Sequence, residues 1–223
     1  MNEYSSSNST DKTVEIAKKL GAEVILDDSK NFSKQREAGL KSATSSYIFY
    51  LDADERVTPE LKEEIETVLK DDLDVGAYEI PRQNYYFGKY PWPYIAYFVR
   101  LFKKESLKGW KGQIHESPLY DGETLRLKGL ISHYTHNDLT SMTDKTINWS
   151  DTEARIRKEA NHPKMSWWRF PRVMITTFLN YYVRQKGYKL GTVGLIESVF
   201  QSYSTFITYA KLWELQNKSK GEN

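Results

Sequence analysis

Hydrophobic and polar residues follow two different periods along the first part of the chain. Apolar positions recur at helical spacing over about residues 10–20, 33–43 and 58–69. Short runs of β-branched and aromatic residues, typical of buried strands, cover residues 24–26, 47–51 and 77–81. Helices that alternate with strands in this way predict an α/β fold with a mostly parallel sheet flanked by helices.

The beginning of the chain departs from this alternation. Ser9 or Thr10 can cap the first helix and Gly21 can end it, but residues 1–8 are polar and serine-rich and carry no strand signal. An α/β sheet normally begins with a full strand–helix unit. We therefore expect that the first strand, the first helix and most of a second strand are missing.

The composition changes between residues 82 and 110, where Tyr, Trp, Pro and Gly dominate. Residues 97–102 have the pattern of a strand, and the rest suits a loop-rich surface of flat rings. Aromatic rings of this kind stack on sugars or fill cores. We expect Tyr97 and Phe102 in the core, and Trp92 suits a surface position as well as a buried one.

We expect a first domain at residues 1–137 and a helical extension at residues 138–223. Apolar residues recur at helical spacing from Val193 to Trp213. No apolar run reaches the roughly 18 residues of a membrane span. Trp, Tyr and Phe mixed with Arg and Lys suit helices that lie in a membrane interface. The alternative is a helical pair that packs on the α/β body or forms a dimer.

Charge separates the two ends of the chain, although the whole chain has a net charge of only +2. Residues 151–223 hold 12 Lys and Arg against 6 Asp and Glu, and the preceding residues hold 20 against 24. A basic tail suggests an anionic partner, and its apolar character favours a membrane surface over nucleic acid. No cysteine is present, which excludes disulfides and thiolate metal sites. The start lacks the apolar core of a signal peptide, so we expect a cytoplasmic protein peripheral to the inner face of the membrane.

Candidate chemistry begins where the strand at residues 47–51 ends. The next four residues are Asp52-Ala53-Asp54-Glu55, and open α/β sheets bind ligands at the carboxyl ends of their strands. Asp52 and Asp54 face the same side if strand geometry persists. Because Mg²⁺ sites use one or two carboxylates plus substrate phosphates, the pair predicts a site for a metal and a diphosphate. The alternative is a strand that ends in a solvated acidic turn.

Two further groups carry acid–base side chains. Glu116 with His115 beside it can serve as a general base, although an isolated His-Glu pair is more often an ordinary surface pair. His133 follows an apolar pair, so it suits a core or turn position, and a metal-ligand role is the second possibility.

Three segments of the chain form a recognisable set, namely STDKTVEIAKKLGAEV, SKQREAGLKSA and YIFYLDADERVTPEL. They resemble the donor half of family 2 glycosyltransferases. The later segments RLFKK, W-x-G-x-IHE, ISHYTHNDL and YAKLWELQ are similar to the branch of lipopolysaccharide-core β-glucosyltransferases. These segments cover nearly the whole chain and stand in the family order.

This resemblance implies a GT-A fold and the inverting transfer of a sugar from a nucleotide sugar, such as a UDP-sugar, to an acceptor hydroxyl. The acceptor would be a glycolipid or a cell-envelope polysaccharide precursor. Asp52 and Asp54 match the D-x-D motif that holds Mg²⁺ or Mn²⁺, and His133 matches a further metal ligand. Glu116, with His115, matches the catalytic base. Donor-binding positions fall on Arg36 and Arg100, with Arg82 as a further phosphate contact.

Three features depart from the family pattern and leave a second possibility open. The apolar first strand is absent, Ser6 stands where an Asp contacts the nucleoside, and Glu37 replaces the Asn after the matched Arg36. The half of the site that binds phosphate and supplies the catalytic base is therefore present, and the half that binds the nucleoside is truncated. The chain is then either an active enzyme or an inactive remnant that serves as a membrane-associated interaction module.

Overall fold

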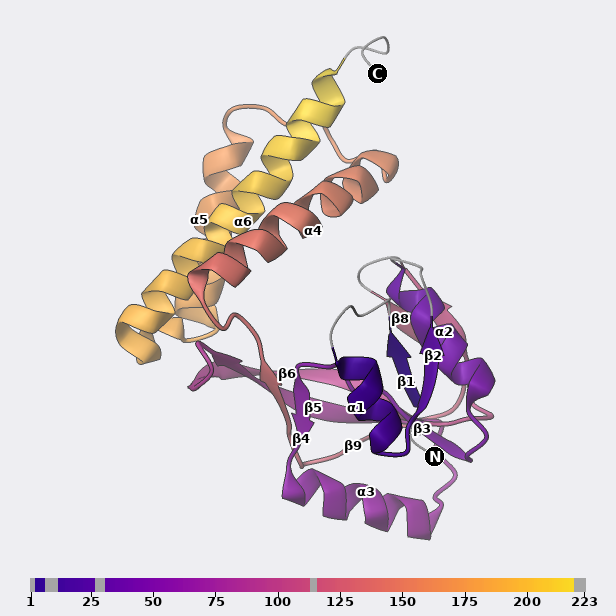
Figure 1. Cartoon of the computed structure of the whole chain (residues 1–223). Coiled ribbons are helices and arrows are strands. Elements are labelled where there is room, and N and C mark those ends of the chain that lie inside the picture. The colour runs from indigo at the N-terminus through magenta and orange to yellow at the C-terminus, as the bar shows by residue number, and fades with distance from the viewer. Residues whose placement is uncertain (1–2, 7–11, 27–30, 113–115, 219–223) are drawn as a thin grey trace. The chain divides into compact units, whose positions relative to one another are not determined.

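The computed structural model of the chain describes residues 3–6, 12–26, 31–112 and 116–218. It divides into two compact units. The sheet unit comprises Met1–Arg82 and Ala96–Ser132, and the helical unit comprises Gln83–Ile95 and His133–Asn223. Figure 1 labels most of the helices and strands of both units.

The strands of the structure form three sheets. The largest has six strands in the order β3-β6-β5-β10-β4, with β9 paired to β5. Two further sheets consist of β1 with β2 and of β7 with β8. The strands are β1 (Glu3–Ser6), β2 (Glu23–Leu26), β3 (Tyr47–Phe49), β4 (Glu55–Val57), β5 (Ala77–Tyr86), β6 (Tyr90–Lys103), β7 (Leu107–Lys111), β8 (Ser117–Tyr120), β9 (Thr124–Arg126) and β10 (Ile131–Tyr134).

The helices confirm the α/β class. The helices are α1 (Thr13–Lys19), α2 (Phe32–Ser42), α3 (Pro59–Asp71), α4 (Leu139–Glu159), α5 (Arg169–Leu179), the π-helical turn η1 (Asn180–Arg184), the 3₁₀ turn η2 (Gly187–Leu190) and α6 (Gly191–Asn217). The large sheet is mixed: β5 and β9 run parallel, whereas β3 and β6 run antiparallel with Ile48 opposite Phe102.

Residues 1–8 carry no strand signal in the sequence, but Glu3–Ser6 form a strand in the structure. These residues form β1, which pairs parallel with β2 and places Tyr4 opposite Val24. Strand pairing joins backbone groups, so a polar segment can join a sheet when a neighbouring strand offers its edge. The proposed helix caps Ser9 and Thr10 lie outside the described residues, and α1 begins after Lys12.

The loop-rich surface expected for residues 82–110 is wrong. Strand β5 extends to Tyr86, and the long strand β6 returns from Tyr90. Phe87 and Gly88 both have positive φ angles, which tight hairpin turns require. Trp92 is 1% exposed and therefore buried, whereas Tyr97 is 43% exposed and not part of the core. Phe102 is buried as expected.

Helix α3 covers one core of the sheet unit. Thr58 caps it, because its side chain accepts a hydrogen bond from the Leu61 backbone N–H at 3.3 Å, and Pro59 follows at the first turn. Leu61 packs with Tyr78, Ile80, Leu101 and other apolar side chains. A second cluster contains Phe102 and Trp110, with Leu40 of α2 packed against it.

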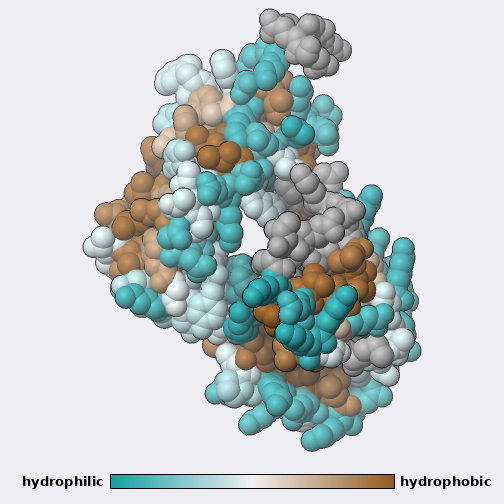
Figure 2. All heavy atoms as spheres, in the orientation of Figure 1, coloured by the Kyte–Doolittle hydropathy of each residue, from teal (hydrophilic) through white to brown (hydrophobic). Residues whose placement is uncertain are grey.

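In the helical unit, α4 and α5 each pack against α6. Asp138 and Ser141 form a capping box at the start of α4. Gly194 allows α6 to approach η2, since a Cβ atom at Gly194 would lie 1.8 Å from the Gly187 carbonyl oxygen. Figure 2 shows hydrophobic side chains gathered over the helices of this unit, on the left of the view. None of the described helices is both long enough and apolar enough to cross a membrane.

Candidate active site

Six charged side chains of alternating sign form one ion-pair network in the sheet unit. They come from six separate segments, namely α2, the turn after β3, the start of β4, β5, β6 and the residue before β8. In order of contact they are Glu116, Arg36, Asp52, Arg100, Glu55 and Arg82.

Asp52 lies at the centre of this network and pairs with two arginines. Its Oδ1 atom lies 2.8 Å from Arg36 Nη2, and its Oδ2 atom lies 2.7 Å from Arg100 Nη2. Burial alone would raise the pKa of Asp52, but the positive charges of Arg100 and Arg36 outweigh it and hold the pKa below 3.8. Asp52 is therefore an ionised carboxylate at neutral pH.

Arg36 connects Asp52 to Glu116. Its Nε atom donates to Glu116 Oε1 at 2.9 Å, and its Nη2 atom lies 2.8 Å from the same oxygen. The guanidinium carbon lies 5.5 Å from the ring centroid of Tyr50 and 5.0 Å from that of Trp110. Burial would lower the pKa of Arg36, but the Asp52 and Glu116 carboxylates raise it. Aromatic walls and two carboxylates thus hold this cation in one orientation.

Glu55 anchors the other end of the network. It is 1% exposed, and its Oε1 atom accepts from Arg82 Nη1 at 3.1 Å and from Arg100 Nη2 at 3.3 Å. Its Oε2 atom accepts from the Asp52 backbone N–H at 3.0 Å, while the Glu55 N–H donates to the Asp52 carbonyl at 2.9 Å. This reciprocal pair closes the turn that presents Asp52 and Asp54.

Arg82 and Arg100 retain unused hydrogen-bonding capacity. The Nε atoms of both side chains are buried and find no acceptor within the part of the chain that the structure describes. The guanidinium carbons lie 4.0 Å and 5.7 Å from the ring centroid of Phe98. Buried donors normally have partners, so two unpaired donors in one place are unusual.

The structure brings together five of the residues that the sequence predicts, Arg36, Asp52, Arg82, Arg100 and Glu116. Asp54 is half-buried in the turn between β3 and β4. His115 lies outside the described residues.

The third expected metal ligand, His133, belongs to the helical unit, where its Nδ1 atom lies 2.9 Å from Asn84 Oδ1. No group of three or more His, Cys, Asp or Glu among the described residues is arranged to hold a metal ion.

Sequence reasoning overlooked two members of the site. Glu55 was visible only as the last acid of Asp52-Ala53-Asp54-Glu55, and its burial could not be inferred from that pattern. Trp110 was visible as one ring of an aromatic segment and as the first residue of the W-x-G-x-IHE segment, but neither pattern shows that it packs against Arg36. Both roles depend on which distant segments meet, and no local signal carries that information.

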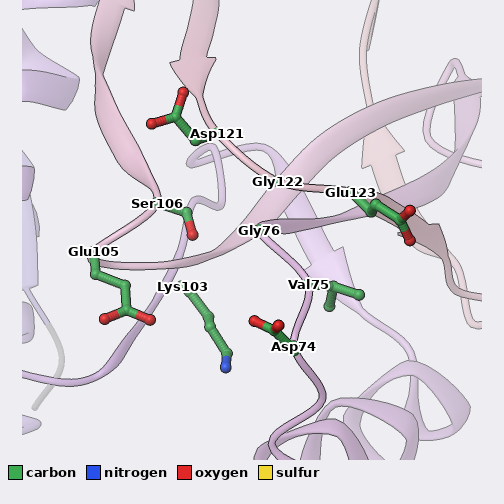
Figure 3. Close-up of a pocket in the computed structure, with 9 residues that line it drawn as sticks. All are labelled: Asp74, Val75, Gly76, Lys103, Glu105, Ser106, Asp121, Gly122 and Glu123. Carbon is green, nitrogen blue, oxygen red and sulfur yellow. The ribbon is translucent and has the colours of Figure 1, made fainter.

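A separate hollow of about 550 Å³ lies elsewhere in the sheet unit. Figure 3 shows its lining, where Asp74 and Glu105 lie around Lys103 and where Gly76 lies beside Gly122. A Cβ atom at Gly76 would lie 1.9 Å from the Asp121 carbonyl oxygen, so glycine there permits close packing of two loops. None of the six network residues lines this hollow.

Comparisons with known proteins identify the family of this fold. The family described as Glycosyl transferase family 2 matches residues 5–135, more than half of the chain. An uncharacterized glycosyltransferase of Rickettsia typhi is 27% identical over 227 residues, which are 95% of this chain and 77% of that protein. A similar protein of Rickettsia prowazekii is 26% identical over the same shares.

Among solved structures, the chain is similar to Staphylococcus aureus TarS (residues 1–349, in complex with UDP), and the match covers 98% of this chain and 82% of the TarS chain. It has 12% sequence identity and a TM-score of 0.41.

Proposed function

Because the chain belongs to glycosyl transferase family 2, it is a glycosyltransferase that uses a nucleotide sugar, and we propose its substrates and mechanism as follows. The donor is a UDP-sugar. The acceptor is a hydroxyl of a glycolipid or of a cell-envelope polysaccharide precursor, as in the lipopolysaccharide-core branch. The transfer inverts the anomeric carbon.

One observation carries this proposal: a single guanidinium, that of Arg36, lies 2.8 Å from both Asp52 and Glu116. These carboxylates are 64 positions apart in the sequence and have separate expected tasks, donor binding and proton abstraction. A direct displacement needs both groups at one reacting centre. Their common contact with Arg36 supports such a centre.

Glu116 is the proposed general base. Its Oε1 atom accepts a hydrogen bond from Arg36, and the contacts of Glu116 with described residues are all made through this oxygen rather than through Oε2. Oε2 can accept the proton of the acceptor hydroxyl as that oxygen attacks the anomeric carbon. The bond between the anomeric carbon and the diphosphate oxygen then breaks, and the nucleotide leaves with the bonding electrons. Arg36 keeps the carboxylate aimed during this step.

Arg82 and Arg100 are the proposed contacts to the donor diphosphate. Guanidinium groups bind phosphate oxygens through several directed N–H groups, and both residues have a buried Nε without a partner among the described residues. Glu55 holds the two arginines beside one another, at 3.1 Å and 3.3 Å from its Oε1 atom. The phosphates would thus meet cations that are already ordered.

Asp52 and Asp54 suit a divalent metal ion whose remaining coordination positions are filled by phosphate oxygens of the substrate. Mg²⁺ sites commonly take only one or two carboxylates from the protein, and each Asp52 oxygen keeps a further lone pair beside its arginine. When bound, Mg²⁺ or Mn²⁺ would neutralise the charge that develops on the departing nucleotide. His133 is not needed for this site.

The test is UDP release from UDP-sugars in the presence of Mn²⁺, with donor binding measured separately by calorimetry. We expect Glu116→Gln to lower kcat by about 10²–10⁴-fold and to leave donor affinity unchanged. Asp54→Ala should lower both turnover and Mn²⁺-dependent donor binding. The exposed Glu66→Gln variant is the matched control. Full turnover of Asp54→Ala, or unchanged kcat of Glu116→Gln, contradicts the proposal.

An inactive remnant gives a different result. It would bind no UDP-sugar at micromolar concentration, and the three variants would then be indistinguishable from the wild-type chain in both assays. Calorimetry on the wild-type chain therefore decides between the two functions before any variant is made.

A further inference from the structure

A stripe of exposed apolar side chains runs along α5 and η1 in the helical unit. Trp168, Ile175, Leu179 and Val183 are each at least half exposed. They are spaced by seven, four and four positions, which places them on one face of a helix. Trp167, next to the start of the stripe, is 83% exposed. Exposed apolar surface this continuous is typical of an interaction site.

The same segment is basic and contains no acid. Residues 160–196 hold six Lys and Arg and no Asp or Glu. Five of the six side chains are exposed, and none of the five forms an ion pair with a carboxylate of the described residues. These five are Lys164, Arg172, Arg184, Lys186 and Lys189. The sixth, Arg169, donates instead to the backbone oxygens of Pro163 and Lys164 at 3.1 Å and 3.0 Å. The carboxylates that the structure describes in this unit therefore leave the positive charge of this surface without ion-pair partners.

We propose that this surface, the α5–η1 face, binds the anionic headgroup region of a lipid bilayer. Trp and aliphatic side chains gain from entering the boundary between headgroups and acyl chains, and Lys and Arg remain at the level of the anionic lipids. The arginines also lie close to a ring that suits this depth, since the guanidinium carbons of Arg169 and Arg172 are 5.9 Å and 5.8 Å from the Trp168 ring centroid.

Charge decides between a bilayer and a second copy of the chain as the occupant. Two copies that met through this face would bring two clusters of like charge together in a desolvated contact, which is unfavourable. An anionic membrane offers the opposite charge over a wide surface. Binding to the membrane is argued independently of the reaction. Only its purpose rests on the proposed function, since the membrane would hold the lipid-linked acceptor and keep the enzyme beside it.

The test is flotation of the full chain with vesicles of phosphatidylcholine alone and of phosphatidylcholine mixed with phosphatidylglycerol. We expect binding to the mixed vesicles that weakens with added salt, and little binding to the neutral ones. Arg184→Glu/Lys189→Glu should lower the partition coefficient by about tenfold or more. Ile175→Ser/Leu179→Ser should lower it as well. Lys41→Glu/Lys128→Glu, which makes the same charge change at exposed positions of the sheet unit, should not.

Several results would overturn this proposal. They are equal binding to neutral and anionic vesicles, binding that survives both face variants, or no binding by the wild-type chain. A concentration-dependent dimer that Ile175→Ser/Leu179→Ser converts to monomer would show that a second copy is the occupant. UDP release without a lipid acceptor, measured on the same variants, separates failure of the membrane proposal from failure of the proposed reaction, because the face variants should leave it unchanged.

Discussion

Replacement of Glu55 by Gln tests whether one buried carboxylate holds the site together. Gln has nearly the same shape, so the change removes the charge without leaving a cavity. One carboxylate oxygen becomes an NH₂ group. Because Oε1 accepts from Arg82 and Arg100 and Oε2 accepts from the Asp52 backbone N–H, the new donor must face another donor in either orientation.

The structure sets the expected size of the effect. Glu55 is fully buried and lies beside two arginines that are themselves mostly buried. Removal of one partner from a buried ion pair costs about 3–5 kcal/mol, since the remaining charge stays uncompensated. A change of 1 kcal/mol shifts the Tm of a chain of this size by about 2–4 °C, so we expect the Tm to fall by roughly 6–20 °C.

Thermal unfolding followed by circular dichroism measures this shift. Glu66→Gln is the matched control, because Glu66 is exposed and its one ion pair with a described residue is with Lys62, at 3.8 Å on the same helix. Such a pair contributes less than about 1 kcal/mol. If Glu55→Gln lowers the Tm no more than Glu66→Gln does, Glu55 does not anchor Arg82 and Arg100 as described.

Two further predictions concern acid stability and glycine packing. Since its two arginines hold the pKa of Asp52 below the ordinary 3.8, this carboxylate stabilises the fold above that pH and loses its contribution as the pH falls through the lower folded-state pKa. Wild-type urea midpoints should therefore fall more steeply on acidification below 3.8 than those of Asp52→Asn, and parallel curves would contradict this cause. Gly39→Ala should stabilise α2 by about 0.5–1 kcal/mol, because a Cβ atom there meets nothing within 4 Å, whereas Gly194→Ala should destabilise by about 1–3 kcal/mol or more. Urea unfolding of both variants measures the difference, and equal stabilities would refute the packing of α6 on η2.

The sequence alone predicted the features that depend on near neighbours. The α/β class followed from alternating periods, and α3 followed from Thr58-Pro59 at its start, because capping and helical periodicity act within a few residues. The position of Asp52 after a short apolar strand was likewise visible in the sequence.

Only the tertiary structure decided which distant segments meet. Strand β1 required the edge of β2, and the return of β6 beside β5 buried Trp92 while leaving Tyr97 exposed. The contact of Arg36 with Glu116 joins residues 80 positions apart. Such contacts depend on how the whole chain closes around its cores, and a period or a motif reports only on its own few residues.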